Sequence, residues 1–328
     1  LKKILFQLSE IESPVQHKYI EYFDGPNNPH FKELFYRKAK IKDVGFRLLG
    51  LFRYWNTVQY FFPYRYLTEQ PWVEVLDEFI PVFHRASTFP ALDSAYLQLF
   101  SKINDGHAFA TLSTPSDVSV FGINNVGFDI KIIRGEAIVA ALGADSLERE
   151  KGLLVGDIIS EVNRVPIIKR IESRRPFIPA SNEKVALKYL ERNLFQTDED
   201  QLEITFTRDG IERVINIPTL KLTSIKPVPE EKTPPFKILN NRIGYVQAGK
   251  FKEKDLKPFL NLMEDKDGLI LDYRQYPVDY LHEVFSNYLF PEKKTFVKLT
   301  KNKGLARGEF IINDSIAVFT IGSSDGYS

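Results

Sequence analysis

The chain has 328 residues, a formal net charge of +1 at pH 7 and 43% hydrophobic residues. This composition supports folded cores, and the near-neutral charge gives no reason to expect a nucleic acid or an anionic membrane as partner. The sequence contains no cysteine, which excludes disulfides, thiolate catalysis and cysteine zinc sites. It also has no run of about 18 apolar residues, so no membrane span is predicted. The length favours two or three domains.

The first part of the chain changes from strand-like to helical spacing. Residues 1–40 mix short β-like runs with loops, and we expect a β-rich N-terminal tail. Residues 41–118 contain three apolar runs with helical spacing, which predict a helical bundle. The first run ends before Pro63, the second begins near Pro71, and the third covers Ser94–Ile103. Their aromatic side chains could stack on bases or sugars, but the spacing favours core packing.

Residues 119–225 have the period of strands. Val126–Leu142 is predicted to form two strands around a turn, and Gln201–Pro218 a hairpin. A helix is predicted at Asn182–Phe195, with Ser181 as its N-cap. A shorter helix is predicted before it, capped by Asp145 or Ser146 and ended by Gly152. These residues therefore predict a small β-domain with two helices.

A proline-rich linker, Lys226–Phe236, precedes the last region, residues 236–328. This region contains strand-like runs at Gly268–Arg274 and Ser315–Ser324 and a helix pattern at about Asp255–Glu264. Apolar strands that alternate with helices predict an α/β core with a mostly parallel sheet.

The stretch GLLVGDIISEVNRVPI, residues 152–167, resembles the signature of PDZ domains in bacterial proteases, with Arg164 where Gly is usual. The order of the predicted elements resembles the permuted PDZ domain of tail-specific proteases. By this resemblance, Gly127 and Phe128 lie in the loop that receives a peptide carboxylate, and the domain binds extended peptides. A packed β-domain with a blocked groove is the alternative.

From about residue 40 the chain resembles the tail-specific (C-terminal-processing) serine proteases, in the tricorn-core-like branch with a PDZ domain and with likeness to exported Bacteroidetes-type members. GLILDYRQYP resembles a strand and turn of the family's core, INDGHAF its histidine segment and LARGEF its nucleophile motif. The resemblance implies a multidomain α+β fold: a helical bundle, a permuted PDZ-like β-domain and an α/β protease core of the ClpP/crotonase type.

The same resemblance implies a serine endopeptidase that cuts peptides or unfolded protein tails and needs no cofactor. It also implies an exported protein, in the periplasm or associated with the outer membrane, whose export signal would already have been removed. A catalytically dead peptide-binding module on a protease scaffold is the alternative, and a different hydrolase activity on this scaffold is a third. The sequence leaves the oligomeric state open.

In LARGEF, Ala306 occupies the position of the family's nucleophilic serine. An inactivating Ser→Ala substitution is one hypothesis, and a natural pseudoenzyme is the other. His107 is the predicted base because imidazole can accept a proton near neutral pH, although an ordinary surface histidine is the alternative. The N–H groups of Arg307 and Val278 are the predicted oxyanion donors. Pro277 has no N–H and departs from the glycines that the family often has there.

Several other features have a structural interpretation. Asp272 ends a predicted strand, and we expect it to anchor the following turn and to pair with Arg274. The basic run Lys169–Arg175 could bind an acidic partner, but we favour a solvated loop. The family's segments are shortened near Gly304–Leu305 and Ser323–Asp325, so we expect residues to be missing there. No metal site is expected, because the remaining histidines lack ligand spacing: His17, His30, His84 and His282.

Overall fold

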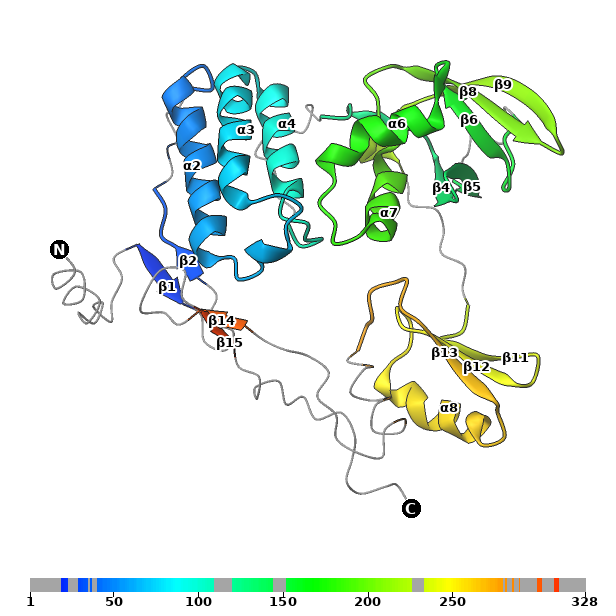
Figure 1. The fold of residues 1–328 in the computed structure, drawn as a ribbon. Helices are drawn as coiled ribbons and strands as arrows, with labels where there is room; N and C mark the ends of the chain where they lie inside the picture. The colour runs from blue at the N-terminus through cyan, green and yellow to red at the C-terminus, as the bar shows by residue number, and fades with distance from the viewer. Residues whose placement is uncertain are drawn as a thin grey trace. The chain divides into compact units, whose positions relative to one another are not determined.

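The computed structural model describes residues 19–22, 29–34, 36, 40–108, 120–143, 152–225, 233–279, 281, 285, 289, 300–302 and 310–312 (Figure 1). The chain divides into two compact units. The first contains the described residues of Leu1–Phe23, Asn27–Pro229 and Asn302–Glu309, and the second contains those of Glu230–Lys301 and Phe310–Ser328. The domain limits expected from the sequence stay predictions. No helix among the described ranges is long and apolar enough to cross a membrane.

Three helices form a bundle in the first unit: α2 (Val44–Phe61), α3 (Trp72–Arg85) and α4 (Phe89–Ser101). The three predicted helical runs are confirmed, but α4 begins earlier than its spacing indicated. The cause is Thr88, whose side chain accepts a hydrogen bond from the N–H of Ala91 and caps the helix. Three aromatic side chains lie in the core, as predicted, whereas Phe52, Tyr66 and Phe89 are exposed. The buried residues of this core include Trp72, Phe79 and Phe83 together with Leu51, Val58, Val75 and Leu99.

A buried arginine joins two helices of this bundle. Arg47 on α2 is 4% exposed. Its guanidinium donates to the carbonyls of Phe83 at 2.9 Å and His84 at 2.5 Å, both in the last turn of α3. Carbonyls in the last turn of a helix have no partner within the helix. Arg47 therefore gives these two carbonyls a hydrogen-bond donor, and the carbonyls give the buried guanidinium its acceptors.

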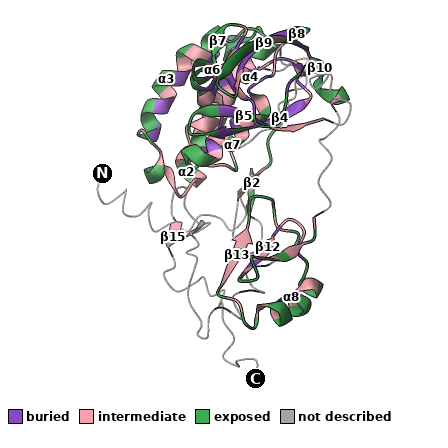
Figure 2. Cartoon of the chain, turned by 90° about the vertical axis from the view of Figure 1, so that its right-hand side faces the viewer, coloured by how far each residue is buried: buried purple, intermediate pink, exposed green. Residues whose placement is uncertain are grey.

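A sheet with strand order β4-β5-β6-β8-β9, with β7 beside β6, forms the other half of the first unit. All its neighbouring strands are antiparallel. Figure 2 shows buried residues on β4, β5 and β8, and side chains from this sheet build much of the core of the β-domain, whereas both residues of β7 are exposed. The strands are β4 (Phe128–Ile133), β5 (Glu136–Leu142), β6 (Ile158–Val162), β7 (Val165–Pro166), β8 (Gln201–Arg208) and β9 (Ile211–Pro218).

The PDZ-like signature has a local physical explanation. Gly152 and Gly156 both have positive φ, which favours glycine. Asp157 is 2% exposed and accepts hydrogen bonds from the N–H of Leu154 at 2.8 Å and from Arg208 at 2.6 Å. Although burial opposes it, the bonds from Arg208 lower the pKa of Asp157. This carboxylate fixes the turn that leads into β6.

Two helices, α6 (Ile167–Arg174) and α7 (Glu183–Asn193), pack against this sheet. Asn182, not Ser181, caps α7, and its Oδ1 accepts from the N–H of Val185. The expected solvated loop at residues 169–175 is wrong, because most of it is helix α6. Arg170 and Arg174 donate to the carbonyls at the end of α7, including Leu194 at 2.5 Å and Gln196 at 2.6 Å.

The second unit has a three-stranded sheet in which β11 is antiparallel to β12 and β12 is parallel to β13. Its core includes Phe251, Phe259 and Phe285. The predicted strand after Gly268 is confirmed but is only half-buried, and Ile270 is 44% exposed. The predicted strand at Ser315–Ser324 lies outside the described residues. The elements are β11 (Phe236–Leu239), β12 (Ile243–Gln247), α8 (Leu256–Met263) and β13 (Gly268–Asp272).

Short elements complete the described chain. The two-stranded pairs are β1 with β2, β3 with β10, and β14 with β15. Their bounds, with those of the 3-10 turns, are β1 (Ile20–Tyr22), β2 (Pro29–Phe31), β3 (Asn124–Asn125), β10 (Leu220–Lys221), β14 (Thr300–Asn302), β15 (Phe310–Ile312), η1 (Arg65–Leu67), η2 (Arg175–Phe177), η3 (Leu222–Ser224) and η4 (Glu253–Asp255).

Candidate functional site

The predicted base lies at a corner just after α4. His107 is almost fully exposed, with 95% of its side chain accessible. The Oδ1 of Asp105 accepts from the backbone N–H of His107 at 2.9 Å and lies 3.1 Å from its Nδ1. An ionised carboxylate can only accept hydrogen bonds, so this contact places a proton on Nδ1. In the neutral ring Nε2 is then the nitrogen with a free lone pair.

A neighbouring side chain fixes the start of this corner. Asn104 has a φ of 53°, a left-handed conformation that asparagine tolerates better than most residues. Its Oδ1 accepts from the N–H of Glu69 at 3.3 Å, and its Nδ2 donates to the Glu69 carboxylate at 3.1 Å. The corner is therefore tied to the segment that precedes α3.

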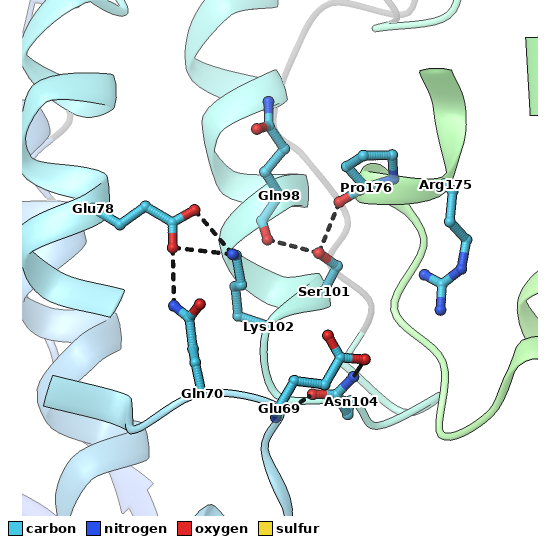
Figure 3. A pocket seen from close by; sticks show the side chains of 9 residues that line it. All are labelled: Glu69, Gln70, Glu78, Gln98, Ser101, Lys102, Asn104, Arg175 and Pro176. Atoms are coloured by element: carbon cyan, nitrogen blue, oxygen red, sulfur yellow. Dashed lines mark hydrogen bonds and ion pairs between the residues drawn. The ribbon is translucent and has the colours of Figure 1, made fainter. Parts of the chain in front are cut away.

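A polar pocket of about 410 Å³ borders the corner (Figure 3). Lys102 forms an ion pair of 2.9 Å with Glu78, and Ser101 donates to the carbonyl of Pro176 at 2.7 Å. Partial burial opposes it, but hydrogen bonds from Lys102 and Gln70 lower the pKa of Glu78. The lining side chains come from both the bundle and the segment at η2, and include Glu69, Gln70, Glu78, Gln98, Lys102 and Arg175.

The predicted carboxylate-binding residues lie at the start of β4. The carbonyl of Gly127 accepts from the N–H of Gly143 at 2.9 Å. The Phe128 side chain is 6% exposed and packs edge-on against Phe195, with ring centroids 5.2 Å apart. Phe128 therefore contributes its ring to the core. If this loop holds a carboxylate, the contact is made by backbone N–H groups.

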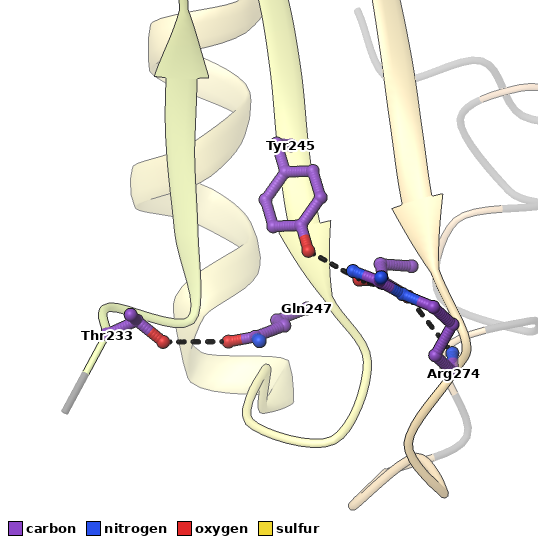
Figure 4. A network of polar contacts seen from close by, with 5 residues as sticks. Thr233, Tyr245, Gln247 and Arg274 are labelled. Carbon is purple, nitrogen blue, oxygen red and sulfur yellow. Dashed lines mark hydrogen bonds and ion pairs between the residues drawn. The ribbon is translucent and has the colours of Figure 1, made fainter. Parts of the chain in front are cut away.

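In the second unit, a network of polar contacts lies at the end of β13 (Figure 4). Asp272 accepts from the Arg274 guanidinium at 2.6 Å and 2.9 Å and from the Tyr245 hydroxyl at 2.5 Å. It also accepts from the backbone N–H of Arg274 at 3.0 Å. The bonds from Arg274 hold the pKa of Asp272 well below its usual range. The expectation that Asp272 anchors this turn and pairs with Arg274 is confirmed.

Two backbone hydrogen bonds close the turn that follows. The N–H of Ala248 donates to the carbonyl of Asp272 at 2.9 Å, and the N–H of Val278 donates to the carbonyl of Ala248 at 3.2 Å. The N–H predicted as an oxyanion donor is therefore already bonded within the protein. For the N–H of Val278 to donate to an oxyanion, its hydrogen bond to Ala248 must first break.

The predicted site is described only in part. Ala306 and Arg307 lie outside the described residues, so the nucleophile position and one oxyanion donor have no described geometry. His107 and Val278 belong to different units, and each is described by itself. Sequence reasoning missed Asp105, although its spacing of two residues from His107 was visible. Within the described ranges, no group of His, Asp and Glu side chains could hold a metal ion.

No family model matches this chain, and no curated protein matches it. Solved structures of CPAF match this chain. Mature CPAF matches with a TM-score of 0.51 and 14% identity, over 74% of this chain and 58% of that chain. A CPAF mutant with serine replaced by alanine matches with a TM-score of 0.52 and 12% identity, over 77% of this chain and 60% of that chain. The chain thus spans less than two thirds of CPAF, and it shares that protein's mixed helix and sheet fold.

A third structure, a photosystem II D1 C-terminal processing protease, has a TM-score of 0.27 and 18% identity over 64% of this chain and 55% of that chain. This TM-score is too low to indicate a common fold.

Proposed function

We propose that this chain belongs to a serine endopeptidase of the tail-specific type, with a helical bundle, a permuted PDZ-like domain and a ClpP/crotonase-like core. The observation that carries the proposal is the His107 corner, where Asp105 leaves Nε2 of the ring directed away from the carboxylate. The fold match to CPAF, a serine protease, supports it. The resemblance to exported proteases further suggests the periplasm or outer membrane as its location.

In the proposed reaction a serine at position 306 attacks the carbonyl carbon of the scissile peptide bond. Nε2 of His107 takes the hydroxyl proton and gives it to the leaving amine when the C–N bond breaks. The N–H groups of Arg307 and Val278 stabilise the tetrahedral oxyanion. Water then attacks the acyl-enzyme carbonyl while Nε2 of His107 takes its proton. The ester C–O bond breaks, the acid product leaves, and His107 returns the proton to the serine oxygen.

The PDZ-like domain has a separate role in this proposal. An extended substrate tail adds as a strand along β4, with its carboxylate at the loop of Gly127 and Phe128. Strand addition needs a sheet edge, and β4 is the last strand in the order of its sheet. The role in peptide capture therefore does not depend on whether position 306 holds serine.

The experiment compares hydrolysis of a denatured protein by the chain as it stands, by Ala306→Ser and by Ala306→Ser with His107→Ala. We expect activity only in the single variant. Activity that survives His107→Ala would exclude this histidine as the base. Absence of activity in all three, together with peptide binding, would favour the alternative of a binding module on a protease scaffold.

A further inference from the structure

Along the outer edge of β4, every second residue directs its main-chain N–H and C=O away from β5. A two-residue turn, Arg134 and Gly135, joins β4 to β5, and both turn residues have positive φ. In such a hairpin the flanking residues, Ile133 and Glu136, form a hydrogen-bonded pair. The N–H groups of Ile132 and Ile130 therefore point away from β5. An added strand would bond to these groups.

One of these edge groups is already occupied. The N–H of Ile132 donates to Oε1 of Glu191 at 3.1 Å, and Lys131 forms an ion pair of 2.6 Å with Oε2 of the same carboxylate. Glu191 lies in the last turns of α7, the helix beside β4. Its side chain is 12% exposed, whereas that of Lys131 is 57% exposed. The carboxylate thus stands where the carbonyl of an added strand would stand.

We propose that Glu191 is a specificity residue that ends strand pairing on β4, so that the domain pairs with only the last few residues of a free carboxyl-terminal tail. The inference rests on the proposed role of this domain in peptide capture. A tail whose carboxylate lies at Gly127 and Phe128 can pair along β4 up to Lys131. At one tail residue for each strand residue, this is about four residues.

The relative strength of the competing hydrogen bonds explains why the strand stops there. The bond from Ile132 to Glu191 has a charged acceptor, and such bonds are stronger than those between neutral groups. A longer peptide would replace it with a neutral carbonyl and leave a largely buried carboxylate with one donor fewer. The extra residues therefore add little to the affinity.

The test uses the full chain and a seven-residue peptide selected from a library with random sequence and free carboxyl termini. The peptide is N-acetylated and shortened from its amino end to three residues, and each Kd is measured by calorimetry. With the native chain, we expect affinity to rise up to about four residues and then to change by less than about twofold. In Glu191→Ala, the seven-residue peptide should bind about three- to tenfold more tightly than the four-residue peptide.

Two further variants test the assignment to this carboxylate. Glu172→Ala removes an exposed carboxylate that pairs with Lys169 on α6. In this variant the affinity should still stop rising at about four residues, as in the native chain. Lys131→Ala retains the hydrogen bond between Ile132 and Glu191, so its affinity should also stop rising at about four residues. Amide hydrogen exchange at Ile132 should accelerate in Glu191→Ala alone, which reports the contact without any peptide.

The outcomes separate this inference from the proposed function. If short peptides bind but affinity in the native chain keeps rising beyond about four residues, the length limit is wrong and peptide capture stands. If Glu191→Ala and Glu172→Ala behave alike, the limit does not come from Glu191. If no peptide binds any variant, strand addition itself is overturned, and the limit with it.

Discussion

The corner at His107 and the turn from Asp272 to Val278 each carry a group assigned to the proposed reaction, and a carboxylate fixes each of them. At the corner, the Asp105 side chain bonds to His107, two positions ahead, and the imidazole is 95% exposed. At the turn, the Asp272 side chain is 9% exposed and bonds to both Arg274 and Tyr245. Bonds that reach other strands resist change more than local bonds at a surface. The imidazole of His107 is thus fixed by a local contact alone, whereas the Asp272 turn is also held from a neighbouring strand through Tyr245.

The largest effect is expected when the N–H of Val278 is removed, and this change tests whether that N–H takes part in the reaction. In Ala306→Ser, a second change Val278→Pro removes the N–H that now donates to Ala248. Loss of one oxyanion donor lowers kcat by about 100- to 1000-fold. Val278→Ala keeps the N–H and should stay near the parent activity, with thermal unfolding as the check on folding. A Val278→Pro variant that folds and retains kcat would remove Val278 from the hole.

The next effect concerns the stability of the turn. Asp272→Ala leaves the Tyr245 hydroxyl and the Arg274 guanidinium without their shared acceptor. We expect the free energy of unfolding of the second unit to fall by about 2 kcal/mol, measured by urea denaturation. Asp267→Ala, which removes an exposed carboxylate beside the exposed Arg242, should change it by less than about 0.5 kcal/mol. Equal effects would mean that the Asp272 network does not hold the turn.

The same carboxylate predicts a dependence on pH. The folded-state pKa of Asp272 lies below its unfolded value of about 4, so its contribution is complete above that pH. The contribution is lost as the pH falls from about 4 toward the folded-state pKa. Thermal unfolding of the second unit, followed from pH 6 to pH 2, should therefore show a steeper acid limb in the native chain than in Asp272→Asn. Parallel limbs would contradict the assignment.

The smallest effect on stability is expected at the corner. Asp105→Ala should change the free energy of unfolding by less than about 0.5 kcal/mol, since the contact is exposed. In Ala306→Ser it should still lower activity by about tenfold, because the ring loses the partner that fixes the proton on Nδ1. Imidazole ¹⁵N chemical shifts should then show more of the Nε2–H tautomer. A tautomer that does not change would leave Asp105 with only a local role in the loop.

Local patterns predicted the local structure well. The three helices of the bundle follow from apolar spacing, and the β8–β9 hairpin follows from its Asp209-Gly210 turn. The anchoring role of Asp272 was also predictable, because its partner Arg274 is only two residues away. These predictions needed only information from neighbouring residues.

Contacts between distant residues could not be predicted in this way. The run at residues 169–175 looked solvated because it is basic, but the carbonyls at the end of α7 satisfy Arg170 and Arg174. The bond between Glu191 and Ile132 joins residues 59 positions apart. Nothing in the spacing near Val278 indicates that Ala248 accepts its N–H. Each of these contacts depends on which segments the fold brings together.

Gly106, in the corner that carries His107, has a further consequence. A methyl group built on Gly106 would lie 3.9 Å from the Tyr189 ring and 4.0 Å from Val185, both on α7. The helix that borders the β4 edge thus also lies beside the corner that carries His107. A side chain at position 106 would therefore lie in van der Waals contact with α7, which joins the packing of this corner to the helix that carries Glu191.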